Sequence, residues 1–275
     1  MFKKSQKRWL LIATCAALLV CYRHVIAGMI DQWSNDEDMG HAFLVPVVIG
    51  FIIWREREQW GRVPIQPSAW GLVLLMLGVC LQVIGAIGAG LFAGSAALLC
   101  SVAGIVMCLG GVPLLKCWRF PLLLTLFMLP KLAILYNQLT LPLQLLASRM
   151  AAGMLMVSGA AVLRAGNILD VNGHQIAIAE ACNGIRYLLP LGFTSLVFAY
   201  LADARPWMRI ALLLWAIPVA IIANAVRVAV SAYSPNLAEG RPHMLLGAAI
   251  FIACVATFPS VRALWDKLAG SVAHA

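Results

Sequence analysis

The chain has 275 residues, of which 63% are hydrophobic and only 11% charged, and its formal net charge is +9. This composition excludes a water-soluble globular protein, whose surface requires about twice as many charged residues. Each membrane crossing needs about 20 residues, so the chain has room for roughly eight helices and no large soluble domain. We expect one all-α polytopic membrane domain over residues 1–275, with a small exterior β-hairpin and an interfacial helix.

Apolar runs along the chain are expected to form about eight crossings. The first, residues 9–30, follows the basic residues of 3–8 and lacks a convincing cleavage site, so we interpret it as an uncleaved span. The remaining runs cover residues 41–54, 70–88, 91–110, 112–136, 184–201, 210–233 and 244–264. The run 41–54 is short and is expected to borrow from its flanks.

Lys and Arg residues define the expected orientation of these spans. They cluster at residues 3–8, 55–62, 116–119, 205–209 and 262–267. All of these clusters face the cytoplasm if both termini lie inside, so the positive charge follows from topology and does not indicate nucleic-acid binding. The loop 31–40, which carries Asp36, Glu37 and Asp38 but no Lys or Arg, then lies outside, where we interpret it as a solvated turn.

The segment 137–179 has the weakest membrane signature, because polar residues recur along one face of an otherwise apolar stretch. We place it as an interfacial helix on the outer side. Further on, the pair Asn172-Gly173 lies between two short runs, and Asn-Gly is the strongest local signal for a two-residue hairpin turn. A small exterior hairpin is therefore expected to lead the chain to Cys182.

Cys182 is the cysteine whose surroundings most favour reactivity. A thiolate is stabilised at a helix N-terminus and beside cations, and Arg186 lies one turn further on the expected helix. Asn183 is a good N-cap for that helix, whereas Glu180 could pair with Arg186. The other cysteines lie mostly in or next to apolar runs. No C-x-x-C pair and no spacing of His, Cys and Asp residues indicates a metal or a cofactor.

The expected topology brings Cys182, Arg227 and His243 to the same outer interface. A thiol nucleophile, a fixed cation and an imidazole are the groups that acyl transfer needs, to attack, to offset the charge of the tetrahedral intermediate and to take the thiol proton. Asn224, one turn before Arg227, could orient the guanidinium or simply link helices. Arg227 could also be an anchor and His243 a solvated loop residue. His41, which opens the second span on the same side, is the main alternative for the base.

Four sequence elements resemble those of the exosortase/archaeosortase family of membrane-embedded cysteine transpeptidase-like enzymes. They are Gly40-His41-Ala42-Phe43-Leu44-Val45-Pro46, Phe127-Met128-Leu129-Pro130, Glu180-Ala181-Cys182-Asn183-Gly184-Ile185-Arg186, and Asn224-Ala225-Val226-Arg227 followed by His243 and Gly247. Asn183 and Ala42 stand where the family more often has Ser and Gly, which leaves the subfamily and its cognate signal open.

This resemblance implies that Cys182 is the nucleophile, Arg227 the transition-state cation and His243 the acid/base. It also implies a substrate class: secreted proteins whose C-terminal tail carries a short Pro-Glu-Pro-type signal, a transmembrane helix and a basic cluster. The enzyme would cut at that signal on the outer face of a bacterial cytoplasmic (inner) membrane, often in exopolysaccharide producers, and pass the acyl group to an acceptor. Membrane lipid is the other expected partner.

A protein of another class remains as an alternative. A small membrane transporter or an exopolysaccharide-export component would place polar residues along a pathway near the membrane midplane. Here the ionisable groups collect at one interface, which favours the enzyme, and the sequence lacks the H-E-x-x-H pair of an intramembrane metalloprotease. Of the two candidate bases we favour His243, because a short loop ties it to the Arg227 end of the preceding span.

Overall fold

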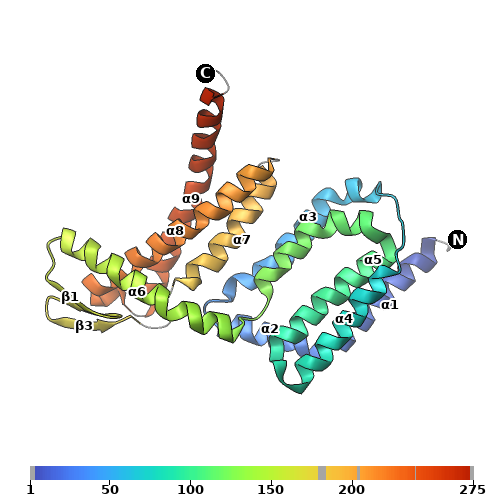
Figure 1. The fold of residues 1–275 in the computed structure, drawn as a ribbon, viewed down its shortest axis with the longest axis horizontal. Helices are drawn as coiled ribbons and strands as arrows, with labels where there is room; N and C mark the ends of the chain where they lie inside the picture. The colour runs from blue at the N-terminus through green and yellow to red at the C-terminus, as the bar shows by residue number, and fades with distance from the viewer. Residues whose placement is uncertain (1–3, 179–183, 203–204, 239, 273–275) are drawn as a thin grey trace. The chain divides into compact units, whose positions relative to one another are not determined.

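The structure is a computed structural model, and it describes residues 4–178, 184–202, 205–238 and 240–272 (Figure 1). Its contacts divide the chain into two compact units, Met1–Leu132 and Ala133–Ala275. Helices dominate both units, as the long apolar runs predict.

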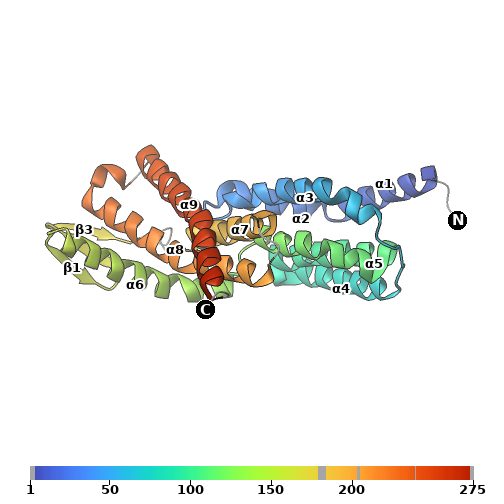
Figure 2. The same cartoon turned by 90° about the horizontal axis from the view of Figure 1, so that it is seen from above.

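The first unit consists of helices and short helical turns. Their bounds are α1 Lys4–Cys21, α2 Arg23–Asn35, the 3-10 turn η1 Gly40–Phe43, α3 Leu44–Gly61, α4 Trp70–Ile84, the π-helical turn η2 Gly85–Ala89, α5 Gly90–Leu124 and the 3-10 turn η3 Thr125–Met128. Both views of the fold show α4 lying alongside the first part of α5 (Figure 1, Figure 2).

Small residues allow α4 and α5 to approach closely. A Cβ on Gly71 would lie 2.5 Å from Cys108 Sγ, and one on Gly104 would lie 2.9 Å from the carbonyl oxygen of Gly71. A Cβ on Gly78 would collide with Ser101 Oγ. In a bilayer, lipid chains are as apolar as side chains, so helices associate through such close backbone contact. The pair is therefore held by the fit of its backbones.

Helix α5 is interrupted at Gly111, whose φ of 74° lies in the left-handed region that favours glycine. A Cβ at this position would also collide with the carbonyl oxygen of Gln66. The break lies between the expected spans 91–110 and 112–136. These two runs thus belong to one interrupted helical stretch, Gly90–Met128.

The second unit combines helices with a small sheet. Its elements are α6 Ala133–Val157, β1 Val162–Ala165, β2 Ile168–Val171, β3 His174–Ala177, α7 Ile185–Ala202, α8 Pro206–Tyr233, the 3-10 turn η5 Pro235–Leu237 and α9 Gly240–Val272. Helix α8 is central, because it contributes to two apolar clusters. Leu212 packs with Leu191 of α7 and Phe258 of α9, and Val228 packs with Ala151 of α6 and the sheet.

The sheet confirms the predicted hairpin. Its strands are antiparallel in the order β1-β2-β3. Asn172 and Gly173 join β2 to β3 with φ values of 53° and 86°, and positive φ at both positions is what a type I′ turn requires. Strand β1 was not expected. The pair Gly166-Asn167 that joins it to β2 is itself a hairpin signal.

Among the described residues, six helices are long and apolar enough to span a membrane, and a seventh crossing results if α1 and α2, bent by 68°, form one span. The chain is therefore a helical multi-pass membrane protein, and the expected number of eight spans is approximate. Helix α3, expected to cross over residues 41–54, is not among the candidate spans. It continues into the charged residues from Arg55 onward, which shorten its apolar part.

Helix α6 differs from the interfacial helix that the sequence suggested. Tyr136–Val157 has a mean hydropathy of 1.3 and qualifies as a membrane span. Two of the polar residues behind the expectation, Gln144 and Ser148, are buried, whereas Gln138 and Arg149 are exposed. Ser148 Oγ donates a hydrogen bond to the carbonyl oxygen of Gly166 at 2.9 Å. A polar stripe that faces neighbouring protein has the same sequence pattern as one that faces water, so periodicity alone does not distinguish an interfacial helix from a span.

Candidate functional site

Three of the residues expected at the site, Glu180, Cys182 and Asn183, lie outside the described residues. The chain is anchored just before them, at the end of the sheet. Ile178 is buried, and its N–H donates a hydrogen bond to the carbonyl oxygen of Asn167 at 2.9 Å.

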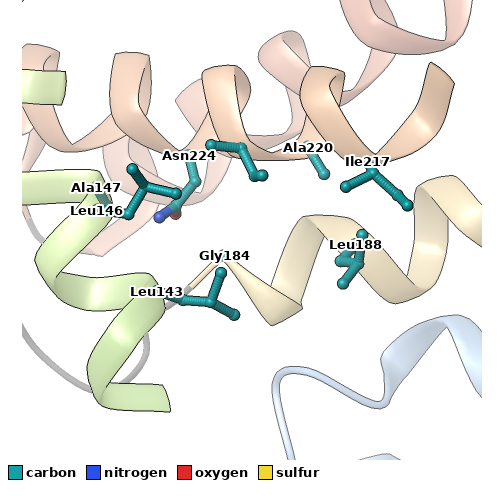
Figure 3. A pocket seen from close by; sticks show the side chains of 9 residues that line it. Leu143, Leu146, Ala147, Gly184, Leu188, Ile217, Ala220 and Asn224 are labelled. Atoms are coloured by element: carbon teal, nitrogen blue, oxygen red, sulfur yellow. The ribbon is translucent and has the colours of Figure 1, made fainter. Parts of the chain in front are cut away.

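The described chain resumes at Gly184, which opens α7 with a φ of 87°. Its carbonyl oxygen accepts hydrogen bonds from the N–H groups of Tyr187 and Leu188 at 3.1 and 3.0 Å. A Cβ at Gly184 would lie 3.4 Å from Nδ2 of Asn224, so the start of α7 lies directly against α8, as Figure 3 shows. Arg186, in the first turn of α7, is partly buried.

Asn224, Arg227 and Ser231 occupy successive turns of α8. Their spacing puts them on one face of the helix, as predicted for the first two. Asn224 and Arg227 are each only 2% exposed, although α8 is a candidate membrane span. Polar and charged groups inside a membrane protein are costly and mark functional sites by default.

Arg227 lies between the Tyr187 ring of α7 and the start of α9. Its guanidinium Cζ lies 5.7 Å from the centre of the Tyr187 ring, and the Tyr187 hydroxyl lies within reach of a guanidinium N–H. On the α9 side, a Cβ at Gly247 would lie 3.5 Å from Cζ. Among the described residues, Arg227 forms no ion pair and its Nε has no hydrogen-bond partner. The positive charge is therefore not neutralised by any described carboxylate.

His243, at the start of α9, has its ring held by the turn that precedes the helix. Nδ1 lies 2.9 Å from the carbonyl oxygen of Leu237 and 3.4 Å from Ser231 Oγ. A carbonyl oxygen can only accept a hydrogen bond, so Nδ1 carries the proton when the ring is neutral. Nε2 then has its lone pair available, which is the state that a general base requires.

Arg227 and His243 lie in adjacent turns of the same helix junction. Ser231, one turn after Arg227 on α8, contacts the His243 ring. Gly247, one turn after His243 on α9, faces the guanidinium, since a Cβ at this position would lie 3.5 Å from Arg227 Cζ. These reciprocal contacts bring together two of the three residues that the sequence assigned to acyl transfer.

An apolar pocket opens beside Gly184 and Asn224, between α6, α7 and α8 (Figure 3). Its cavity volume is about 70 Å³, and its lining is apolar except for Asn224. Leu143 of α6 and Leu188 of α7 point into it from opposite sides.

His41, the alternative base, belongs to the first unit. Its Nδ1 lies 3.2 Å from the carbonyl oxygen of Asp38, and its ring also bonds to the backbone of Phe127. Burial lowers the pKa of His41, although these backbone bonds and the charge of Asp38 act in the opposite direction. The ring therefore links the sequence elements 40–46 and 127–130.

The acidic loop is ion-paired, which corrects its interpretation as a solvated turn. Lys131 Nζ lies 2.7 Å from a carboxylate oxygen of Asp36 and 2.6 Å from one of Asp38. Burial alone would lower the pKa of Lys131, but the hydrogen bonds and charges of the two carboxylates outweigh it and raise the pKa. Trp33 Nε1 donates a hydrogen bond to the carbonyl oxygen of Met128 at 3.1 Å, which adds a second contact between the same two segments of the chain.

Sequence reasoning missed Tyr187 and Ser231 at the α8–α9 junction and Lys131 in the first unit. Ser231 had a usable signal, since it follows Arg227 by one helical turn on the same face. Tyr187 and Lys131 had none, because their partners are distant in the chain. Among the described residues, no group of His, Cys, Asp and Glu could hold a metal ion.

Fold and site together define a multi-pass membrane protein with a buried cation and an oriented imidazole at one helix junction. The chain belongs to the transmembrane exosortase family, whose model matches residues 33–259 and so includes all four sequence elements that carried the resemblance. No curated protein and no solved structure matches the chain.

Proposed function

We propose that this protein is a cysteine peptidase and transpeptidase that processes the C-terminal tails of secreted proteins. The observation that supports this most is the environment of Arg227. A buried cation with no described ion-pair partner stabilises an anion that forms against it, and the tetrahedral intermediate of acyl transfer is such an anion. Guanidinium suits this role because it stays protonated and presents a rigid fork of donors.

The first half-reaction forms a thioester. Cys182 precedes Gly184 by two residues, a length of chain that reaches at most about 7 Å. Its Sγ attacks the scissile carbonyl carbon, and the thiol proton passes to Nε2 of His243. The carbonyl electron pair moves to oxygen, which accepts hydrogen bonds from Arg227. Collapse of this intermediate breaks the C–N bond, and the leaving amine takes the proton from His243.

The second half-reaction regenerates the enzyme. Water or an acceptor nucleophile attacks the thioester carbon and gives its proton to His243. The C–S bond then breaks, and the thiolate takes the proton back. Asn224, against the start of α7, supports the site by holding Gly184 and thereby the end of the segment that carries Cys182.

The substrates we propose carry a Pro-Glu-Pro-type signal, a transmembrane helix and a basic cluster. The enzyme acts at the outer face of a bacterial cytoplasmic membrane, with both of its own termini in the cytoplasm. The basic clusters of the chain support this orientation through the positive-inside rule.

The test replaces Cys182 in cells that express a tagged substrate. Cys182→Ala should abolish the size shift of the substrate and the adduct that hydroxylamine forms from a thioester, while membrane insertion stays unchanged. Cys80→Ala is the matched control, because Cys80 is an exposed cysteine on α4 of the first unit and belongs to none of the four sequence elements. Cleavage at the wild-type rate in Cys182→Ala would refute the nucleophile.

A further inference from the structure

We propose that Tyr187 is a positioning residue, which fixes the guanidinium of Arg227 against α9 at the level of His243. This rests on the proposed role of Arg227 in acyl transfer. Tyr187 lies one turn into α7 and is 3% exposed. It is the residue through which α7, α8 and α9 meet at the guanidinium.

The Tyr187 hydroxyl forms a relay between two helices. It donates a hydrogen bond to the carbonyl oxygen of Gly247 at 3.4 Å and lies within reach of a guanidinium N–H of Arg227, from which it can accept a second bond. A hydroxyl has one donor and two acceptor lone pairs, so both bonds can exist together. Because Gly247 lies one turn after His243, the relay sets where the guanidinium lies relative to the base.

A neutral positioning group suits a transition-state cation better than a carboxylate does. An Asp or Glu would hold the arginine firmly but would also neutralise it. The Tyr187 ring and hydroxyl restrict the guanidinium and leave its charge available. The ring lies 5.7 Å from Cζ, a cation–π contact that fixes one side of the group.

The alternative is that Tyr187 only fills the core, since it also packs in the apolar cluster with Leu191 and Leu212. Tyr187→Phe separates the two roles, because it keeps the ring and its packing and removes only the hydroxyl. Tyr200→Phe is a matched control: Tyr200 is also on α7 and also lies beneath an arginine, with Arg209 Cζ 5.0 Å from its ring centre.

The experiment measures steady-state cleavage of a tagged substrate by the purified, reconstituted full chain, over a range of substrate concentrations. Tyr187→Phe should lower kcat about 10-fold or more with KM unchanged, whereas Tyr200→Phe should keep the wild-type kcat. In a protein that already carries Arg227→Lys, Tyr187→Phe should cause little further loss of kcat, because the hydroxyl acts through the guanidinium. Gly247→Val, which pushes a side chain toward Cζ from α9, should lower kcat in the same way.

Two results would overturn the positioning role. One is a Tyr187→Phe variant with wild-type kcat, and the other is an equal loss from Tyr187→Phe with Arg227 and with Lys at position 227. Cys182→Ala in parallel keeps the two proposals apart. An active Cys182→Ala protein rejects the cysteine mechanism, whereas an inactive one beside a fully active Tyr187→Phe protein rejects only the role of Tyr187.

Discussion

Replacing Arg227 by Met should make the protein more stable and nearly inactive. Met has a similar length and no charge, so it removes the cost of holding an ion inside the protein, which is several kcal/mol after relaxation. The substitution also loses the contacts with the Tyr187 hydroxyl and ring, which contribute about 1–3 kcal/mol each. Because no described carboxylate compensates the charge, and replacing buried ionic groups by apolar side chains of similar volume is often stabilising by about 1–4 kcal/mol, we expect a net gain of about 1–3 kcal/mol in the free energy of unfolding.

The gain should be visible as a higher Tm in detergent, by about 2–4 °C per kcal/mol for a chain of this size. Cleavage of a tagged substrate should fall about 10²–10³-fold, the usual cost of one lost oxyanion donor. Arg209→Met is the control on the same helix, since Arg209 is less buried and should not raise Tm. A Tm that falls by several degrees in Arg227→Met would show that the charge is compensated in the folded state and would refute the reasoning.

Three further predictions concern the bases and the first unit. His243→Ala should slow acylation of Cys182 far more than His41→Ala, measured as thioester trapped per unit time; the reverse ranking would move the base to His41. Gly78→Leu should destabilise the protein by about 1–3 kcal/mol through overpacking against Ser101, whereas Gly50→Leu, with open space at its Cβ position, should not; equal Tm values for the two variants would contradict the close contact of α4 with α5. Because burial lowers the pKa of His41, the unfolded chain binds this proton more readily; Tm should therefore fall as pH drops from about 7 to 5, and His41→Asn should flatten that dependence. If the Tm of His41→Asn fell with pH as steeply as that of the wild type, the pH dependence would come from other groups.

Local signals in the sequence carried the parts of the fold that were predicted correctly. The Asn172-Gly173 turn needs positive φ at both positions. Few residue pairs adopt this conformation readily, so these two residues were enough to predict the hairpin. Apolar length likewise predicted helices that span the membrane. The family resemblance depended on short elements in the same way, and the family model confirmed it.

The parts that were missed depend on partners far away in the chain. Lys131 bonds to Asp38 across 93 residues, so nothing near the acidic loop showed that it would be ion-paired. Ser148 of α6 resembled an interfacial residue because its partner, Gly166, lies beyond the helix. Tyr187 is one aromatic residue in an apolar helix, a pattern that indicates core packing until the guanidinium beside it is known.

The anchors at Ile178 and Gly184 have a consequence for how the family can diversify. Ile178 is hydrogen-bonded to Asn167 at the end of the sheet, and Gly184 packs against Asn224, so the residues between them join two packed positions. A change in the number of residues in this stretch would displace one of these positions and, with it, the proposed nucleophile Cys182. Insertions and deletions should instead accumulate at the exposed turns of the sheet, where neither anchor is displaced.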